Sequence, residues 1–445
     1  MSLVAKNILI KNGRVIDPAS QTDCVQDVLI SDGVIQKIAR NISVDNHTQV
    51  IDLASSSSRE YWVCPGLVDI HVHFREPGQG HKETIATGSQ SALVGGFTSV
   101  ATMPNTKPVL DNLETLEWTY KKIKETSVVN IFPVAAATVG LLGQQMTDIQ
   151  SLVNQGVLAF SDDGNCVMNA GLMRRILEYC ASLNVPFLCH AEDTNLSHKG
   201  VMNESHASTC MGLHGMPNVS ESVIVARDIE LSRLTGAHVH FCHISASESI
   251  RLIRLAKAEG LNITAEVTPH HLALSDAATL GFNTNAKMNP PLRAEVDKNI
   301  LIEALCDGTI DCVATDHAPH SPDEKERAFA ECPFGVVGLE TAVGVSLSEL
   351  YHTQKMTALE WVNVMSTKPA KILNLNAGKL QVGQPADITI IDPNSKWVVD
   401  PEQFKSKSRN TPFAGQELTG QAVATIVAGE LLFQKPLPAF SELQK

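Results

Sequence analysis

Short apolar runs alternate with stretches of helical periodicity through the middle of the chain, from about residue 63 to 372. The apolar runs have the length of buried strands, and the stretches between them carry apolar residues three and four positions apart. We expect strands that end near Phe74, Asn105, Thr138, Asp163, Glu192, Ser245, His271 and His317. Helices are expected at 84–94, 113–125, 170–183, 221–234, 246–258 and 294–306. Eight strands alternating with helices predict an α/β fold with a (β/α)8 TIM-like barrel, whose active sites lie at the carboxyl ends of the strands.

The two ends of the chain have a different pattern, in which short β-type runs are separated by turns. These runs lie at 7–13, 27–35, 50–53, 385–392 and 422–430. Asn12-Gly13 and Asp32-Gly33 are dipeptides that favour two-residue hairpin turns. The pattern predicts a discontinuous domain of residues 1–62 and 373–445, folded as one small β-sandwich beside a barrel of residues 63–372.

The composition is that of an ordinary globular protein, with 43% hydrophobic and 19% charged residues. No apolar run approaches the roughly 20 residues that span a bilayer, and the first residues lack the pattern of a signal peptide. A formal charge of −13 argues against nucleic acid or an anionic membrane as a partner, so an anionic substrate needs local cations. The ten cysteines form no Cys-x-x-Cys pair, and Cys189, Cys242 and Cys312 lie in apolar runs, as expected for reduced thiols of a cytoplasmic protein.

Residues of the types that bind metals gather at the expected strand ends. His71 and His73 lie two positions apart, so both point to one face of the first strand, and Arg75 continues that face. The later ends carry Asn105, Asp162-Asp163, His190, Glu192, His243, His270-His271, Asp316, His317 and His320. Polar groups that close apolar strands are costly to bury unless they bind something. Four imidazoles and two carboxylates suit two borderline divalent ions, for which we predict zinc.

The strand order suggests how these side chains divide between two zinc ions. In the expected division the first ion is held by His71 and His73, and the second by His190 and His243. An aspartate at the fourth strand end would bridge them. Asp162 and Asp163 face opposite ways on a strand, so only one of the two can point inward. Asp316 would be a ligand of the first ion and a proton carrier. Two metal ions that share a bridging water lower its pKa toward neutrality and polarise a carbonyl under attack.

Seven segments resemble motifs of the dihydroorotases, in the amidohydrolase superfamily of cyclic amidases. They are His-Val-His-Phe-Arg-Glu-Pro-Gly at 71–78, Met-Pro-Asn-Thr at 103–106, Phe-Ser-Asp-Asp-Gly at 160–164, Cys-His-Ala-Glu at 189–192, Cys-His-Ile-Ser at 242–245, Met-Asn-Pro-Pro-Leu-Arg at 288–293 and Thr-Asp-His-Ala-Pro-His at 315–320. The resemblance places the bridging ligand at Asp163. Hydantoinases and many dihydroorotases bridge with a carboxylated lysine, but 157–164 contains no lysine, so the chain is similar to bacterial type I enzymes that bridge with aspartate.

The resemblance implies a hydrolase that opens (S)-dihydroorotate reversibly to N-carbamoyl-L-aspartate in pyrimidine biosynthesis. A hydroxide held between the two zinc ions would attack the ring amide, while Asp316 takes its proton and then delivers it to the ring nitrogen. The resemblance also implies the substrate contacts. The carboxylate would be bound by Arg75, Asn105 and His320. The rest of the substrate would be bound by His73, by Asn289 at the amide edge, and by the backbone near Phe334 and Gly335.

Other interpretations share the same barrel and metals. A hydantoinase, dihydropyrimidinase or allantoinase would act on a ring without a comparable carboxylate, and Arg75 and the missing lysine argue against these activities. An inactive homologue could instead be a scaffold for an enzyme such as aspartate transcarbamoylase. An active homodimer could also associate with that partner.

Several other polar residues are expected to lie outside the set of metal ligands. Packing or surface positions are expected for His238 and His240, and a structural role for His317. Hydrogen bonds to the metal ligands are expected for Glu192, His270 and His271. The charged loop at 321–331 is either a surface excursion or a lid over the site.

Overall fold

The computed structural model describes residues 7–54 and 60–436, and its strands fall into a parallel set and a mixed sheet. The parallel set comes from the middle of the chain. Its first sheet consists of β6 (Leu67–Val72), β7 (Phe97–Thr102) and β8 (Asn130–Pro133). Its second consists of β9 (Ala135–Ala136), β10 (Phe160–Ser161), β11 (Phe187–Cys189), β14 (Val239–Phe241), β15 (Ile263–Val267) and β16 (Cys312–Val313). All neighbours in these two sheets run parallel, so the chain has the expected α/β fold.

The two parallel sheets are linked at both of their ends. Only Val134 separates β8 from β9, and its amide donates to the Thr102 carbonyl of β7 at 2.9 Å. After β16, His317 forms a parallel bridge with Val72 of β6. One apolar cluster takes side chains from both sheets, including Val68, Ala101, Val134, Ala159, Leu188, Cys242 and Cys312. Strands of the two sheets therefore surround a common interior.

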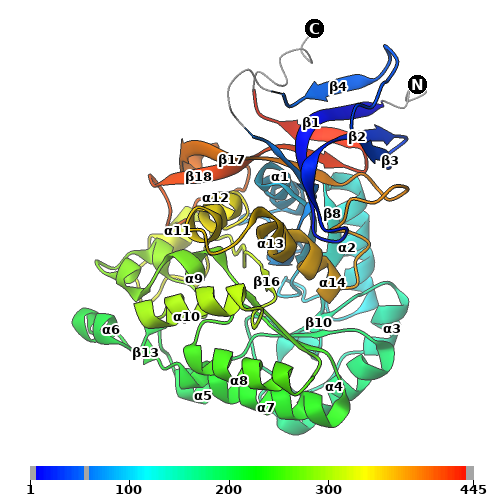
Figure 1. The fold of residues 1–445 in the computed structure, drawn as a ribbon. Coiled ribbons are helices and arrows are strands. Elements are labelled where there is room, and N and C mark those ends of the chain that lie inside the picture. The colour runs from blue at the N-terminus through cyan, green and yellow to red at the C-terminus, as the bar shows by residue number, and fades with distance from the viewer. Residues whose placement is uncertain (1–6, 55–59, 437–445) are drawn as a thin grey trace.

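Long helices connect the parallel strands and lie around them in Figure 1. They are α1 (Ile85–Gly95), α2 (Leu113–Thr126), α4 (Ala170–Leu183), α7 (Val219–Thr235), α8 (Ser247–Ala258) and α10 (Glu295–Cys306). All six were expected, and α4 shows why. Its buried side chains, Met173, Ile176, Leu177 and Cys180, recur at helical spacing. The Asn169 side chain caps its start, and Asn184 ends it in the left-handed conformation.

Shorter elements occupy the remaining connections. The helices are α3 (Ile149–Asn154), α5 (Thr194–Ser197), α6 (His206–Met211), α9 (Pro269–Ala273), α11 (Pro322–Lys325), α12 (Ala342–Ser346), α13 (Ala358–Val362) and α14 (Lys368–Ile372). Two small strands, β12 (Met202–Asn203) and β13 (Gly215–Met216), pair in parallel next to α6. Within 7–54 and 60–436, no helix has the length and apolar character needed to cross a membrane.

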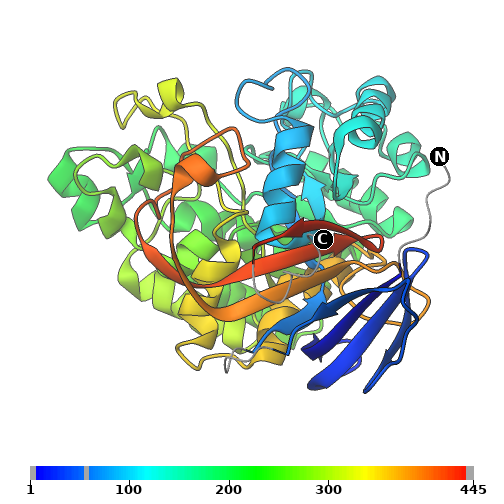
Figure 2. The ribbon, with the colours of Figure 1, turned by 90° about the horizontal axis from the view of Figure 1, so that it is seen from above.

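Strands from the two ends of the chain form one sheet, whose blue and orange-red ribbons lie together in Figures 1 and 2. Its order is β19 (Glu430–Gln434), β18 (Glu417–Val427), β17 (Ile388–Val398), β5 (Trp62–Pro65), β1 (Ile8–Asp17), β2 (Thr22–Ser31) and β3 (Val34–Ala39), and β4 (Gln49–Asp52) also pairs with β1. β5 pairs with β1 on one side and with β17 on the other, so it joins the N-terminal strands to the C-terminal ones.

The prediction of a hairpin turn at Asn12-Gly13 is wrong. β1 continues through both residues, with a shift in its register against β2 between Ile10 and Gly13. Asn12 adopts a φ of 61°, and a Cβ atom at Gly13 would lie 2.4 Å from Val63 Cγ2. The dipeptide therefore makes a bulge where β1 packs closely against β5. Asp32-Gly33 does turn the chain between β2 and β3, as expected.

Candidate metal centre and active site

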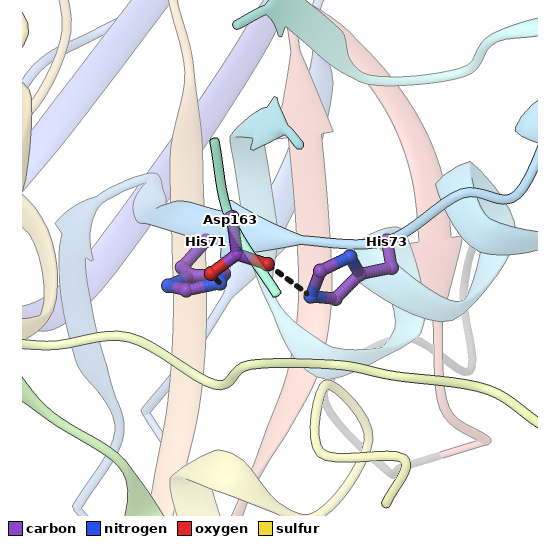
Figure 3. A group of neighbouring side chains, drawn as sticks. All are labelled: His71, His73 and Asp163. Atoms are coloured by element: carbon purple, nitrogen blue, oxygen red, sulfur yellow. Dashed lines mark ion pairs between the residues drawn. The ribbon is translucent and has the colours of Figure 1, made fainter. Parts of the chain in front are cut away.

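The first two histidines enter the site from the end of β6. His71 is the next-to-last residue of the strand, and His73 follows it. His71 Nε2 lies 3.3 Å from Asp163 Oδ1, and His73 Nε2 lies 3.5 Å from Asp163 Oδ2 (Figure 3). All three side chains are buried. Each oxygen of Asp163 therefore faces one histidine of the pair.

A second pair of histidines approaches the same carboxylate from the ends of β11 and β14. His190 Nδ1 and His243 Nε2 are 3.0 Å apart, and each lies 3.6 Å from Asp163 Oδ1. Asp316 lies against the first pair, with its Oδ1 atom 3.0 Å from His73 Nε2 and 3.6 Å from His71 Nε2. Asp163 thus lies close to all four imidazoles.

The donor atoms of this cluster fit a metal cation. His71 Nε2 and Asp163 Oδ1 are buried and have no hydrogen-bond partner among the residues that the structure describes. Leaving a buried polar atom unpaired costs about 1–3 kcal/mol, so such atoms usually bind something. Two groups of potential ligands, His71-His73-Asp163 and Asp163-His190-His243, each bring their ligand atoms within 4.8 Å of one another. Imidazole and carboxylate donors in this arrangement suit zinc.

A network around Asp162 explains why Asp163 faces the histidines. The Asp162 side chain accepts hydrogen bonds from the amides of Ala137 at 3.0 Å and Thr138 at 2.9 Å, and from the Thr138 hydroxyl. These bonds tie β10 to the chain after β9. β10 ends at Ser161, and with Asp162 held against Thr138 the next side chain, Asp163, lies among the histidines. The structure thus separates two carboxylates that the strand pattern alone left equivalent.

The metal-free cluster is a strongly coupled set of charges. Burial opposes ionisation of Asp163, but His71, His190 and His243 hold its pKa well below the usual range. Burial likewise opposes protonation of the imidazoles, yet Asp163 and Glu266 raise the pKa of His71, and Asp163 and Glu192 raise that of His190 to about 10. Without a metal, protons on His71 and His190 therefore balance the buried carboxylates.

The cluster opens into a cavity of about 220 Å³ at the carboxyl ends of the parallel strands. The cavity brings together every site residue expected from the sequence except His71, which lies beneath it. Its lining consists of His73, Arg75, Asn105, Asp163, Gly164, His190, His243, Asn289, Asp316, Ala318, His320, Phe334 and Gly335. A larger cavity, of about 440 Å³, lies at the opposite ends of the strands and shares none of these residues.

Arg75 and His320 both line the cavity, but they differ in charge. The Arg75 Nε–H donates to the Pro319 carbonyl at 3.2 Å, and no described carboxylate forms an ion pair with this guanidinium. Burial lowers the pKa of Arg75 to about 10, against the attraction of Asp316, so Arg75 stays charged at neutral pH. Burial and the charges of Arg75 and Lys82 lower the pKa of His320, so its ring is neutral. Arg75 is thus a buried cation that is attracted by Asp316 but forms no ion pair among the described residues.

The two asparagines of the cavity contact metal-site histidines directly or through Glu192. Asn105 Oδ1 lies 2.9 Å from His73 Nδ1 and can accept a hydrogen bond from the Nδ1–H group of that ring. Asn289 Nδ2 donates to Glu192 Oε2 at 2.7 Å, and this oxygen lies 3.1 Å from His190 Nε2. Each contact turns the opposite ring nitrogen of its histidine toward Asp163 or Asp316.

The loop at 321–331 is tied down by two buried lysines. The Lys325 ammonium donates to the carbonyls of Lys287, Pro333 and Gly335 at 3.0–3.3 Å. The Lys287 ammonium donates to Phe329 and Cys332 at 2.6 Å each. A Cβ atom at Gly335 would lie 2.8 Å from Ala318, so this wall of the cavity requires glycine.

Glu266 was missed in the sequence, and His240 was expected only in a packing or surface position. Glu266 Oε1 lies 2.7 Å from His71 Nδ1, and its Oε2 lies 3.0 Å from His240 Nε2. Both residues are fully buried. A carboxylate inside the apolar strand 263–267 was a visible signal, because such a group is rarely buried without a partner. Its partner His71 lies on another strand, far away in sequence.

Known structures share this fold over almost the whole chain. L-hydantoinase (dihydropyrimidinase) from Arthrobacter aurescens superposes with a TM-score of 0.87 at 24% identity, covering 96% of each chain. Dihydropyrimidinase from Brevibacillus agri NCHU1002 superposes with a TM-score of 0.84 at 23% identity, covering 96% of this chain and 95% of that one. At these identities the likeness establishes the fold. The chain thus has the same fold as these two proteins.

Comparison with curated relatives shows the family to which the chain belongs. Residues 61–249 match the family described as Dihydro-orotase-like. Dihydroorotase from Pelobacter propionicus is 45% identical over 96% of this chain and 100% of its own length. Dihydroorotase from Pelotomaculum thermopropionicum is 47% identical over 96% of this chain and 98% of its own length. The chain belongs to the dihydroorotase family.

Zinc binding at this cluster should release protons at neutral pH. His71 and His190 have raised pKa values in the metal-free protein, that of His190 reaching about 10, and a zinc ligand must be a neutral imidazole. Zinc affinity should therefore rise with pH. Calorimetry in buffers of different ionisation enthalpy counts the protons released, and His190→Asn should release fewer. A binding enthalpy independent of the buffer would contradict this charge arrangement.

Proposed function

We propose that this protein catalyses the reversible hydrolysis of (S)-dihydroorotate to N-carbamoyl-L-aspartate, the dihydroorotase step of pyrimidine biosynthesis. The observation that carries the proposal is the cavity that joins the potential metal ligands to Arg75, a buried cation that forms no ion pair among the described residues. A cyclic amide that bears a carboxylate suits both features. Identity of 44–47% to curated dihydroorotases over nearly the full chain supports the same activity.

We propose two zinc ions per subunit as the cofactor. His71, His73 and Asp316 would hold the first ion, His190 and His243 the second, and Asp163 both, without a carboxylated lysine. When bound, the ions would supply a water of lowered pKa and polarise the carbonyl of the substrate. The unpaired Oδ1 atom of Asp163, between the two histidine pairs, supports its assignment as the shared ligand.

Asp316 is the proposed proton carrier. His73 and His71 hold its pKa well below the usual range despite burial, so the carboxylate is ionised at neutral pH. It takes the proton of the attacking water as the new carbon–oxygen bond forms. It then gives that proton to the ring nitrogen as the carbon–nitrogen bond breaks, which restores the carboxylate. The reverse reaction uses the same group in the opposite order.

The substrate would be held by side chains that line the cavity. The Arg75 guanidinium would pair with the carboxylate, which is a charge-assisted contact of planar groups. Neutral His320 and the Asn105 amide would donate further hydrogen bonds to it. Asn289 would bind the amide edge, and the backbone of Phe334 and Gly335 would close the pocket. Arg75 favours dihydroorotate over the uncharged rings of hydantoinase and allantoinase substrates.

We also propose the finer architecture expected from the sequence. The bridge between His317 and Val72 and the shared interior cluster support a closed (β/α)8 barrel over 63–372. The sheet joined through β5 supports a single discontinuous domain of 1–62 and 373–445, for which we propose a β-sandwich. A cytoplasmic homodimer that associates with aspartate transcarbamoylase is proposed as its state in the cell. The buried thiols of Cys189, Cys242 and Cys312 suit a reducing compartment.

The zinc-loaded protein should interconvert dihydroorotate and N-carbamoyl-aspartate and should leave hydantoin, dihydrouracil and allantoin almost unchanged. A spectrophotometric assay of all five compounds, with and without a chelator, tests this specificity. Preferred turnover of an uncharged ring would overturn the substrate assignment. Metal binding without any turnover would favour the scaffold interpretation.

Asp316→Ala should lower kcat by about 10²- to 10⁴-fold, the usual contribution of a general acid–base group. Zinc should remain bound through the other ligands, as metal analysis of the purified variant would show. Asp323→Ala is the matched control, because Asp323 is an exposed aspartate of α11 outside the cavity. A variant Asp316→Ala with the activity of this control would remove Asp316 as the proton carrier.

Arg75→Ala should raise KM for dihydroorotate by about 10- to 100-fold, since hydrogen bonds to charged groups contribute roughly 1.5–3 kcal/mol. The smaller change in kcat would separate binding of the carboxylate from the chemical step. Arg327→Ala, which alters an exposed arginine of the neighbouring loop, serves as the control. Unchanged KM in Arg75→Ala would exclude a contact with the substrate carboxylate.

A further inference from the structure

A continuous column of hydrogen-bonding side chains runs through the interior of the parallel strands to the metal site. It begins at His238 Nε2, which lies 2.7 Å from Thr264 Oγ1. Thr264 Oγ1 lies 2.8 Å from His240 Nδ1, and His240 Nε2 lies 3.0 Å from Glu266 Oε2. Glu266 Oε1 lies 2.7 Å from His71 Nδ1. Every link has ordinary hydrogen-bond length.

The register of β14 and β15 builds this column. His240 is paired directly with Thr264 across the two parallel strands. His238 lies two residues before His240, and Glu266 two residues after Thr264, so each pair shares one face of its strand. The next residue of that face, Cys242, belongs to the apolar cluster inside the strands. The column therefore crosses an otherwise apolar interior, where polar groups are tolerated only if their bonds are satisfied.

The hydrogen-bonding capacity of each group fixes the direction of the whole column. An ionised Glu266 only accepts, so His71 donates through Nδ1–H and His240 through Nε2–H. His240 Nδ1 then accepts from the Thr264 hydroxyl, which in turn accepts from His238 Nε2–H. The Glu266 carboxylate also accepts the His243 amide at 3.2 Å. One carboxylate thus contacts residues from both histidine pairs.

We propose that Glu266 is a positioning residue which, held by His240, Thr264 and His238, fixes His71 as the Nδ1–H tautomer and presents its Nε2 lone pair to a metal. The inference rests on the proposed metal site. A shift in Thr264 or His240 would be transmitted to His71 through Glu266. The far end of the column, at His238 and Thr264, lines the 440 Å³ cavity at the opposite ends of the strands.

Zinc competition against a chelator tests the column through metal affinity. In Glu266→Gln, one carboxylate oxygen that accepts from His71 or His240 is replaced by an NH2 group. The imidazole facing that group must then lose its hydrogen bond or change its tautomer. Its zinc affinity should fall about 10- to 100-fold, the usual effect of losing an outer partner of a ligand. Thr264→Val keeps the shape but breaks the middle link, and its affinity should fall several-fold. Thr98→Val is the matched control, because the buried Thr98 hydroxyl has no described partner.

Histidine NMR tests the same column without metal. In ¹⁵N-histidine-labelled metal-free protein, His240 should be the Nε2–H tautomer, its signal being assigned by its loss in His240→Asn. Thr264→Val should shift this signal, and Thr98→Val should not. Zinc affinities of Glu266→Gln and Thr264→Val within twofold of the control, or an Nδ1–H tautomer at His240, would overturn the proposal. Failure of the unmodified protein to bind zinc would instead refute the proposed metal site, while the tautomer would still decide the column.

Discussion

The carboxylate of Asp163 is the constraint on which the site depends. A buried carboxylate is stable only when donors or cations surround it, and four imidazoles meet around this one. The histidines come from three strands that are distant in sequence. Their convergence therefore requires these strands to end at one level of the fold. Arg75 and Asp316 line the cavity next to these histidines.

Other buried carboxylates hold the strand ends in this arrangement. Asp69 Oδ2 accepts from the Thr315 hydroxyl at 2.5 Å, which ties β6 to the chain after β16. Asp162 ties β10 to Thr138, and Glu266 ties β15 to His71. Each bond crosses between strands directly behind a residue of the metal cluster. The site is thus supported from behind by side-chain bonds as well as by the backbone ladders.

Local signals in the sequence predicted the long helices well and placed the candidate ligands at the strand ends, because both depend on patterns within single elements. Helical periodicity and a capping asparagine defined α4, and strand alternation put His71 and His73 on one face. The hairpin at Asn12-Gly13 failed because the dipeptide allows a positive φ but does not require the chain to reverse. Glu266 and His240 were missed because their contacts depend on the register between strands, which no local pattern encodes. The choice between Asp162 and Asp163 likewise depended on Thr138 in the neighbouring strand.

The central claim is that Asp163 joins two metal ions beside a pocket for an anionic cyclic amide. Anomalous diffraction at the zinc edge, from crystals of the zinc-loaded protein, tests it most directly. The expected result is two peaks that flank the Asp163 carboxylate, one near His71 and His73 and the other near His190 and His243. A single peak, or zinc bound away from Asp163, would contradict the claim.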